Sequence, residues 1–123
     1  MKRVLIIDDA ATVRMYHRKI LEDCGFEVDE AVNGLEALEK AIATEYDLFI
    51  VDINMPKMDG YRFIAELRAR EEFSQVPAIM VSTESETKDS DRAFAAGANF
   101  YLIKPARPVE LTTSVRLMLG EPA

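Results

Sequence analysis

Three short apolar runs and one further expected strand in this sequence are each followed at once by side chains that can carry chemistry. The apolar runs span residues 4–7, 48–51 and 77–81, and the further strand spans 99–103. The side chains after them are Asp8 and Asp9, Asp52, Ser82 and Thr83, and Lys104. A fully apolar run bounded by turn signals is typical of a strand buried on both faces of a parallel sheet. The carboxyl ends of such strands lie at one edge of the sheet, where ligands bind. The runs therefore predict one shared site, provided that their strands are neighbours.

Asp52 is the candidate reactive group, because a carboxylate can act as a nucleophile toward phosphorus and form an acyl phosphate. It would share the site with Asp8 and Asp9, and two unit charges about 4 Å apart repel by about 4 kcal/mol at an effective dielectric constant near 20. Folding alone does not require such a cluster, so a cation is expected to compensate it. Lys104 supplies one positive charge, and the remainder suits Mg²⁺, which takes carboxylate and carbonyl ligands and keeps some waters. This set favours phosphoryl transfer, with Ser82 donating to a phosphoryl oxygen.

The rest of the chain alternates regularly between helical and strand patterns. Helical spacing of apolar residues occurs at 13–24, 35–42, 59–67, 84–97 and 109–119, and a further, more polar strand is expected at 26–32. Five strands alternating with five helices predict a doubly wound α/β fold with a parallel sheet. The strand at 26–32 is expected near an edge, because polar residues interrupt it.

The helical patterns also predict which side chains face the core. The inward stripe of the second helix is expected to be Leu35, Leu38 and Ile42, and that of the last helix Val109, Leu111, Thr112, Val115 and Met118 or Leu119. The segment 84–97 has few large apolar residues, chiefly Phe94, so it is expected to be the weakest helix.

Composition excludes several classes of protein. The chain has 123 residues, 49% of them hydrophobic, which fits a single domain with its own core. A net charge of −7 argues against a nucleic-acid partner, which would need a basic patch. Cys24 is the only cysteine, so a reducing, cytoplasmic location without disulfides is expected. The apolar runs are far shorter than the span of about 18 residues that a membrane helix needs, so no membrane association is expected.

Taken together, these residues resemble those of response-regulator receiver domains, the CheY-like family, over essentially the whole chain. The matching marks are the acid pair Asp8-Asp9, Asp52 followed by Asn54-Met55-Pro56 and Asp59-Gly60, then Ser82, and Tyr101 three residues before Lys104-Pro105. The resemblance implies a flavodoxin-like (βα)5 fold with strand order 2-1-3-4-5. It also implies a single receiver domain over residues 1–123, with no output domain.

The resemblance assigns a role to each site residue. Asp52 would accept a phosphoryl group from the phosphohistidine of a histidine kinase, so the protein would be a phosphoacceptor rather than an enzyme. Asp9, Asp52 and the backbone carbonyl of Asn54 would bind Mg²⁺ directly, and Asp8 would bind it through water. Lys104 would pair with the phosphoryl group, and the Lys104–Pro105 bond would be cis.

The resemblance also implies a switch made of Ser82, Thr83 and Tyr101. Ser82 would move toward the phosphoryl group and Tyr101 would turn inward behind it. A charge-assisted hydrogen bond of roughly 1.5–3 kcal/mol shifts a two-state equilibrium by roughly 10- to 150-fold. An output protein would bind the face formed by the fourth helix, fifth strand and fifth helix, and the chain is expected to be a monomer. Thr83 stands where the family usually has Ala or Gly.

Four functions are open from the sequence. The first is a stand-alone phosphorylated switch, which could act in chemotaxis, as a phosphate sink, or by binding a kinase or adaptor. The second is an aspartyl-phosphate hydrolase of the haloacid dehalogenase type, which needs an acid two residues after Asp52, where Asn54 stands. The third is a flavin mononucleotide binder, whose phosphate the pair Asp8-Asp9 would repel. The fourth is an inactive scaffold, although every acid of the family is present.

Overall fold

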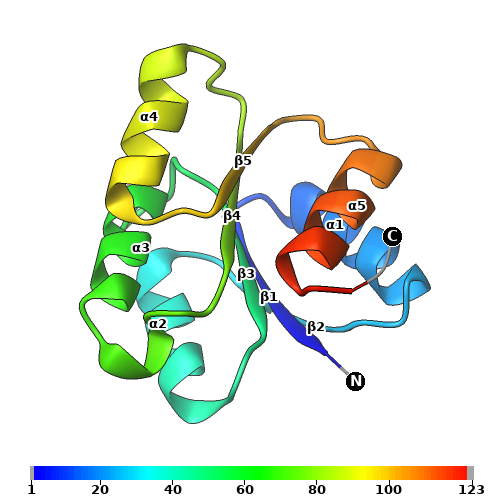
Figure 1. Cartoon of the computed structure of the whole chain (residues 1–123), viewed down its shortest axis with the longest axis horizontal. Coiled ribbons are helices and arrows are strands. Elements are labelled where there is room, and N and C mark those ends of the chain that lie inside the picture. The colour runs from blue at the N-terminus through cyan, green and yellow to red at the C-terminus, as the bar shows by residue number, and fades with distance from the viewer. Residues whose placement is uncertain (1, 122–123) are drawn as a thin grey trace.

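A parallel sheet runs through the middle of the molecule, and helices cover both of its faces (Figure 1). In this computed structural model, residues 2–121 are described. The strands are β1 (Arg3–Ile7), β2 (Glu27–Ala31), β3 (Leu48–Val51), β4 (Ala78–Ser82) and β5 (Phe100–Ile103). Their order across the sheet is 2-1-3-4-5, which confirms the doubly wound fold and places the more polar β2 at an edge, as predicted.

The helices form two layers. One face of the sheet carries α2 (Gly34–Ala43), α3 (Gly60–Arg68) and α4 (Thr87–Ala96), and the other carries α1 (Ala11–Asp23) and α5 (Pro108–Met118) (Figure 1). A short 3-10 helix, η1 (Glu71–Phe73), lies between α3 and β4 and was not predicted. Within residues 2–121, each helix is too short or too polar to span a bilayer.

Alternate residues of the central strands pack into two separate cores. Along β1, Leu5 and Ile7 face the core under α2 and α3, whereas Val4 and Ile6 face the core under α1 and α5. All four side chains are fully buried. Because both faces of the sheet are covered, the buried positions 4–7 of β1 are all apolar, and this is why the central strands appear in the sequence as short apolar runs.

The inward faces of two helices differ from the prediction. In α2, Leu35 and Ile42 are 46% and 60% exposed, and the buried positions are occupied by small residues such as Ala37 and Ala41. In α5, Leu111 and Val115 are buried as predicted, but Val109 is 77% exposed. Where a helix lies close to the sheet, small side chains fit and larger ones are displaced to the surface, so apolar character alone does not identify the inward stripe.

Candidate functional site

Three carboxylates meet at the carboxyl ends of β1 and β3, which are neighbours in the sheet. Ile7 is paired with Val51 in register, so the chain delivers Asp8 and Asp52 to adjacent positions. One oxygen from each of Asp8, Asp9 and Asp52 lies within 4.8 Å of the others. Asp8 and Asp52 are only 2% and 8% exposed, whereas Asp9 is exposed. The structure thus brings together the acids that the sequence placed after separate strands.

Lys104 reaches this cluster from the end of β5. Its ammonium lies 2.7 Å from Oδ2 of Asp8 and 3.0 Å from Oδ1 of Asp52. Burial on its own would lower the pKa of Lys104, but its hydrogen bonds to the two carboxylates raise that pKa above the ordinary value. Lys104 is therefore charged and bridges the two buried acids. The Lys104–Pro105 peptide bond is cis.

The negative charge of the cluster is only partly compensated. Burial raises the pKa of Asp52, the charge of Asp8 raises it further, and Lys104 opposes both effects. Three carboxylates face one ammonium, and their oxygens are close enough for one ion to contact all of them. A hard divalent cation with oxygen ligands, such as Mg²⁺, fits this set of donors. Asn54, the fourth expected ligand, follows β3, and its side-chain nitrogen lies 3.4 Å from Oε1 of Glu84.

The loop after Asp52 folds back onto it at Gly60. The Gly60 N–H donates to the carbonyl of Ile53 at 2.8 Å. A Cβ atom at position 60 would lie 2.1 Å from the carbonyl oxygen of Asp52, so only glycine fits there. The Asp59 side chain accepts a hydrogen bond from the N–H of Arg62 and so caps the start of α3. The backbone of Asp52 is thus held against the first turn of the next helix.

The switch residues are connected through one residue of the loop after β4. Ser82 is 1% exposed, and its hydroxyl oxygen accepts a hydrogen bond from the N–H of Glu84 at 3.1 Å. The carbonyl of Glu84 accepts a hydrogen bond from the Tyr101 hydroxyl at 2.6 Å. Tyr101 is half-buried, and burial raises its pKa. Thr83 is exposed beside Ser82.

Two features near Lys104 were not predicted. Tyr16, which lies within the helical pattern at 13–24, is 43% exposed and donates a hydrogen bond to the carbonyl of Ala106. His17 is 2% exposed, and its Nδ1 has no hydrogen-bond partner among the described residues. The spacing of apolar residues places both side chains on one helix, but a contact with a residue 90 positions away leaves no signal in a single sequence.

Comparison with known proteins shows where similar chains occur. Residues 4–116 match the family described as the response regulator receiver domain. Chemotaxis protein CheY1 of Helicobacter pylori is 36% identical over 120 residues, covering 96% of this chain and 97% of that protein. The structure of chemotaxis protein CheY4 of Vibrio cholerae superposes with a TM-score of 0.91 at 34% identity, covering 96% and 98% of the two chains. Response regulator TrrA of Thermotoga maritima, in complex with Mg²⁺-BeF, gives a TM-score of 0.86 at 34% identity, covering 96% and 99%.

The length of the relatives varies. The chain spans about half the length of several curated transcriptional regulatory proteins that it also matches. The family match reaches from β1 into α5, so it includes the whole acid cluster and Lys104. The chain belongs to the response regulator receiver domain family.

Proposed function

We propose that Asp52 accepts a phosphoryl group from the phosphohistidine of a histidine kinase. The observation that carries the proposal is the convergence of Asp52 with two further carboxylates and one ammonium at the ends of separate strands. A buried charge cluster of this kind opposes folding unless ligand binding compensates it. Phosphoryl transfer uses such groups, because its transition state carries negative charge that positive groups must stabilise.

In the proposed step, one carboxylate oxygen of Asp52 forms a bond to phosphorus. The bond between phosphorus and the imidazole nitrogen of the donor breaks, and the electron pair stays on that imidazole. Lys104, already between Asp8 and Asp52, would neutralise charge on the phosphoryl oxygens. Asp52 is modified in this step, so the protein is a phosphoacceptor and assists its own modification.

The acid cluster would also hold the metal that this chemistry uses. Asp9, Asp52 and the backbone carbonyl of Asn54 would be direct ligands, with Asp8 bound through water. Bound Mg²⁺ would supply positive charge to the phosphoryl oxygens. Support comes from the three convergent carboxylates and from the similar structure of TrrA, which was solved in complex with Mg²⁺-BeF.

The hydrogen bonds around Glu84 suggest how modification of Asp52 would be transmitted. If Ser82 turns to donate to a phosphoryl oxygen, the N–H of Glu84 must find a new acceptor. The carbonyl of Glu84 accepts a hydrogen bond from the Tyr101 hydroxyl, so the loop after β4 and Tyr101 would move together. Thr83, which lies between Ser82 and Glu84, would share in that movement.

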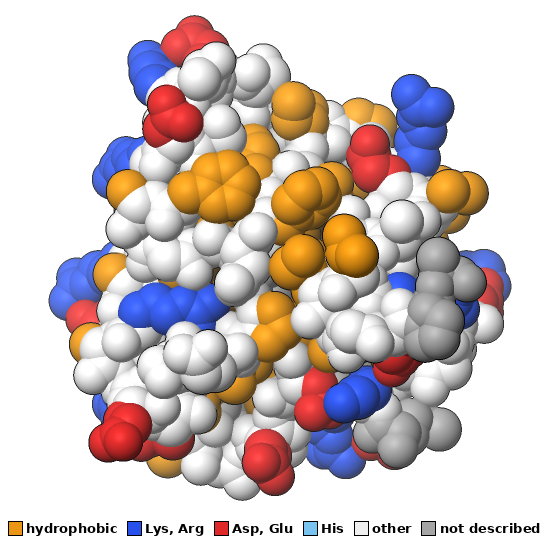
Figure 2. All heavy atoms as spheres, in the orientation of Figure 1, with side chains coloured by type: hydrophobic (Ala, Val, Ile, Leu, Met, Phe, Trp, Pro, Cys, Tyr) orange, Lys and Arg blue, Asp and Glu red, His pale blue; other side chains and the backbone are white. Residues whose placement is uncertain are grey.

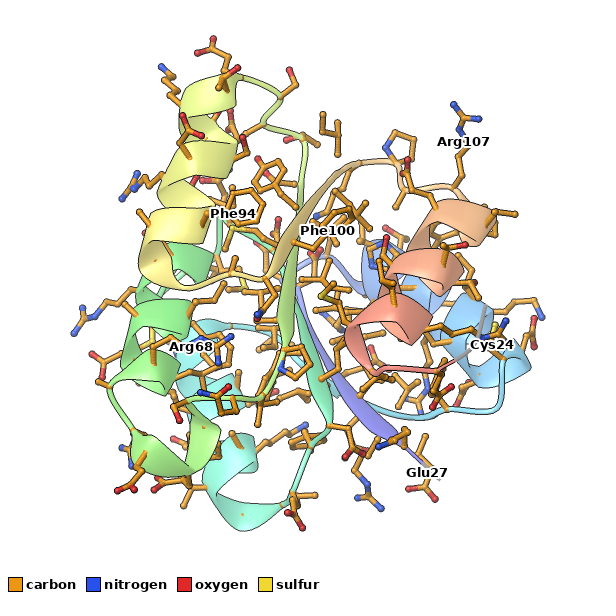
Figure 3. The ribbon with its side chains drawn as sticks, viewed as in Figure 1. Cys24, Glu27, Arg68, Phe94, Phe100 and Arg107 are labelled. Carbon is orange, nitrogen blue, oxygen red and sulfur yellow. The ribbon has the colours of Figure 1, made fainter. Side chains whose placement is uncertain are left out.

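The output surface would be the face formed by α4, β5 and α5. Phe94, Phe100 and Ile103 are 48%, 36% and 48% exposed, and Figure 2 shows apolar side chains gathered over this face. Figure 3 shows Phe94 on α4 and Phe100 on β5. An output protein would bind there. The similarity to CheY1 over nearly its full length supports a role in chemotaxis. A phosphate sink, or a receiver that binds a kinase or adaptor, would use the same chemistry at Asp52.

The test is incubation with acetyl phosphate and Mg²⁺, followed by intact-mass spectrometry. A single labile phosphate is expected on the parent and on Asp23→Asn, which changes an exposed acid of α1. No adduct is expected with Asp52→Asn or after chelation of the metal. An adduct that survives in Asp52→Asn would refute the assignment, and turnover of many equivalents of an external phosphate ester would favour the hydrolase instead.

A further inference from the structure

One side chain of α1 holds the loop that carries Lys104 into the site. The Tyr16 hydroxyl donates to the carbonyl of Ala106 at 2.9 Å, two residues beyond Lys104. Ala106 is fully buried, so water does not replace this hydrogen bond in the folded protein. Among the described residues 2–121, it is the one hydrogen bond from a side chain to the backbone of residues 105–107. The other hydrogen bond to this segment comes from α5, where the N–H of Leu111 donates to the carbonyl of Arg107.

The hydrogen bond between Tyr16 and Ala106 connects the helix that follows the acid pair with the loop that follows Lys104. Helix α1 begins directly after the acid pair, at Ala11, and the loop after β5 carries the ammonium. The N–H of Lys104 donates to the carbonyl of Ser82 at 2.7 Å, which fixes the start of the loop to β4. Pro105, the next residue, has no N–H to donate. Tyr16 therefore supplies the connection between the loop and the helix that follows the acids.

A hollow adjoins Lys104 on the side of α1. A cavity of about 320 Å³ lies between α1 and the loop, and it is lined by Thr12, Val13, Tyr16, His17, Lys104 and Pro105. The His17 ring is tilted against the Tyr16 ring with centroids 5.6 Å apart, and its Nδ1 makes no hydrogen bond within the described chain. His17 thus supports the tyrosine ring without tethering the loop. Ala106 packs in the core under α1 and α5, and the hydrogen bond from Tyr16 fixes the carbonyl of this residue on the side of α1.

We propose that Tyr16 is a positioning residue for phosphoryl transfer, whose hydroxyl holds the loop after β5 so that the Lys104 ammonium stays between Asp8 and Asp52. The role rests on the proposed function of Asp52. Tyr16 acts through Lys104, because its hydroxyl is bonded to the loop and not to the acids. The rate of a reaction that depends on a positioned charge falls steeply when that charge is displaced, by about 100-fold for a shift of about 1 Å.

The test compares phosphorylation rates with acetyl phosphate as the donor. A small donor is chosen because Tyr16 is 43% exposed and could also touch a docked kinase. Tyr16→Phe removes the hydroxyl alone and is expected to lower the rate by about 3- to 10-fold. The matched control is Tyr46→Phe. Tyr46 lies just before β3, and the substitution removes a hydroxyl that donates a hydrogen bond to Asp29. This variant should keep the parent rate.

A second comparison separates positioning from a general effect on the fold. In a Lys104→Ala background, adding Tyr16→Phe should change the rate by less than about twofold, because the group that Tyr16 positions is gone. A slower rate that persists in this background would overturn the proposal, as would equal rates for Tyr16→Phe and the parent. Tyr16→Leu, checked by circular dichroism, repeats the measurement if the Phe variant folds poorly.

The outcomes also distinguish this inference from the proposed function. A parent that takes up phosphate on Asp52, with Tyr16→Phe equally fast, rejects the positioning role and leaves the role of Asp52 intact. A parent that takes up no phosphate rejects the role of Asp52, and the positioning role falls with it.

Discussion

Replacing Asp52 by Asn should stabilise the protein when no divalent cation is present. The substitution keeps the size of the side chain and removes one charge from a buried cluster. Functional sites commonly hold groups that oppose folding, so a variant that loses the function can gain stability. The expectation is specific to this site, because most substitutions of buried residues are destabilising.

The size of the effect follows from the charges around Asp52. Oxygens of Asp8 and Asp9 lie within 4.8 Å, and at that separation each repels Asp52 by about 3.5 kcal/mol at an effective dielectric constant near 20. Lys104, at 3.0 Å, attracts it by about 5.5 kcal/mol on the same scale. Solvent screens the exposed Asp9, whereas burial penalises the charged form of Asp52, so these two corrections oppose each other. The charge on Asp52 therefore destabilises the fold by about 1–2 kcal/mol, in agreement with its raised pKa.

The assay is thermal unfolding of the parent and Asp52→Asn in chelator at neutral pH. A gain of this size corresponds to a rise in melting temperature of about 5 °C for a domain of this length. Asp23→Asn, at an exposed ion pair with Lys19, should shift stability by less than about 0.5 kcal/mol. Adding Mg²⁺ should stabilise the parent more than Asp52→Asn, since the variant lacks a metal ligand. A variant that melts below the parent in chelator would refute the claim that repulsion dominates the cluster.

Three further predictions concern single residues of the site. Burial and the charge of Lys104 lower the pKa of His17 in the folded protein. The stability that neutral His17 contributes is therefore present above the ordinary pKa of about 6.5, and it is lost as the pH falls below that value. His17→Leu should therefore become more stable relative to the parent between about pH 7 and 5, and parallel denaturation curves across that range would contradict this. Thr83→Ala should shorten the lifetime of the acyl phosphate a few-fold, because a smaller exposed side chain admits water; equal rates of phosphate loss would show that Thr83 gives no shielding. Gly60→Ala should lose more than about 2 kcal/mol in urea titrations, because its Cβ would lie 2.1 Å from the Asp52 carbonyl oxygen; an unchanged midpoint would mean that the loop adapts.

The fold was predictable because burial on both faces of the sheet leaves a strong mark on the sequence. In β1, neighbouring residues such as Leu5 and Ile6 enter different cores, so each of its four buried positions is apolar. The reactive side chains follow these runs directly, so the edge at which they meet follows from the parallel arrangement. The strand order came from resemblance, since periodicity does not specify which strands are neighbours.

The contacts that could not be predicted are those between distant side chains. Arg68 shows this clearly, since its half-buried guanidinium carries no predicted role and yet joins α3 to two other segments. It donates hydrogen bonds to the carbonyls of Phe73, Val76 and Gly97 and to the side chain of Asn99. In the sequence it is one basic residue at the end of a helix, which is also the pattern of an exposed side chain. Phe73 and Val76 lie in the segment just after α3, whereas Gly97 and Asn99 become partners only because α3 packs against α4.

Arg68 also bears on the proposed switch, because it fixes one end of α4. The carbonyl of Gly97, at the end of α4, is held by Arg68 at 2.9 Å. Within the described chain, Ala93, near that end, is the one buried residue of α4. The first turn of α4 is held more weakly. It has an exposed capping box formed by Glu86 and Asp89, and the Tyr61 hydroxyl donates a long hydrogen bond of 3.3 Å to the carbonyl of Asp89. A hydrogen bond gained at Ser82, worth roughly 1.5–3 kcal/mol, is enough to rearrange such a turn but too small to detach a helix fixed at its other end.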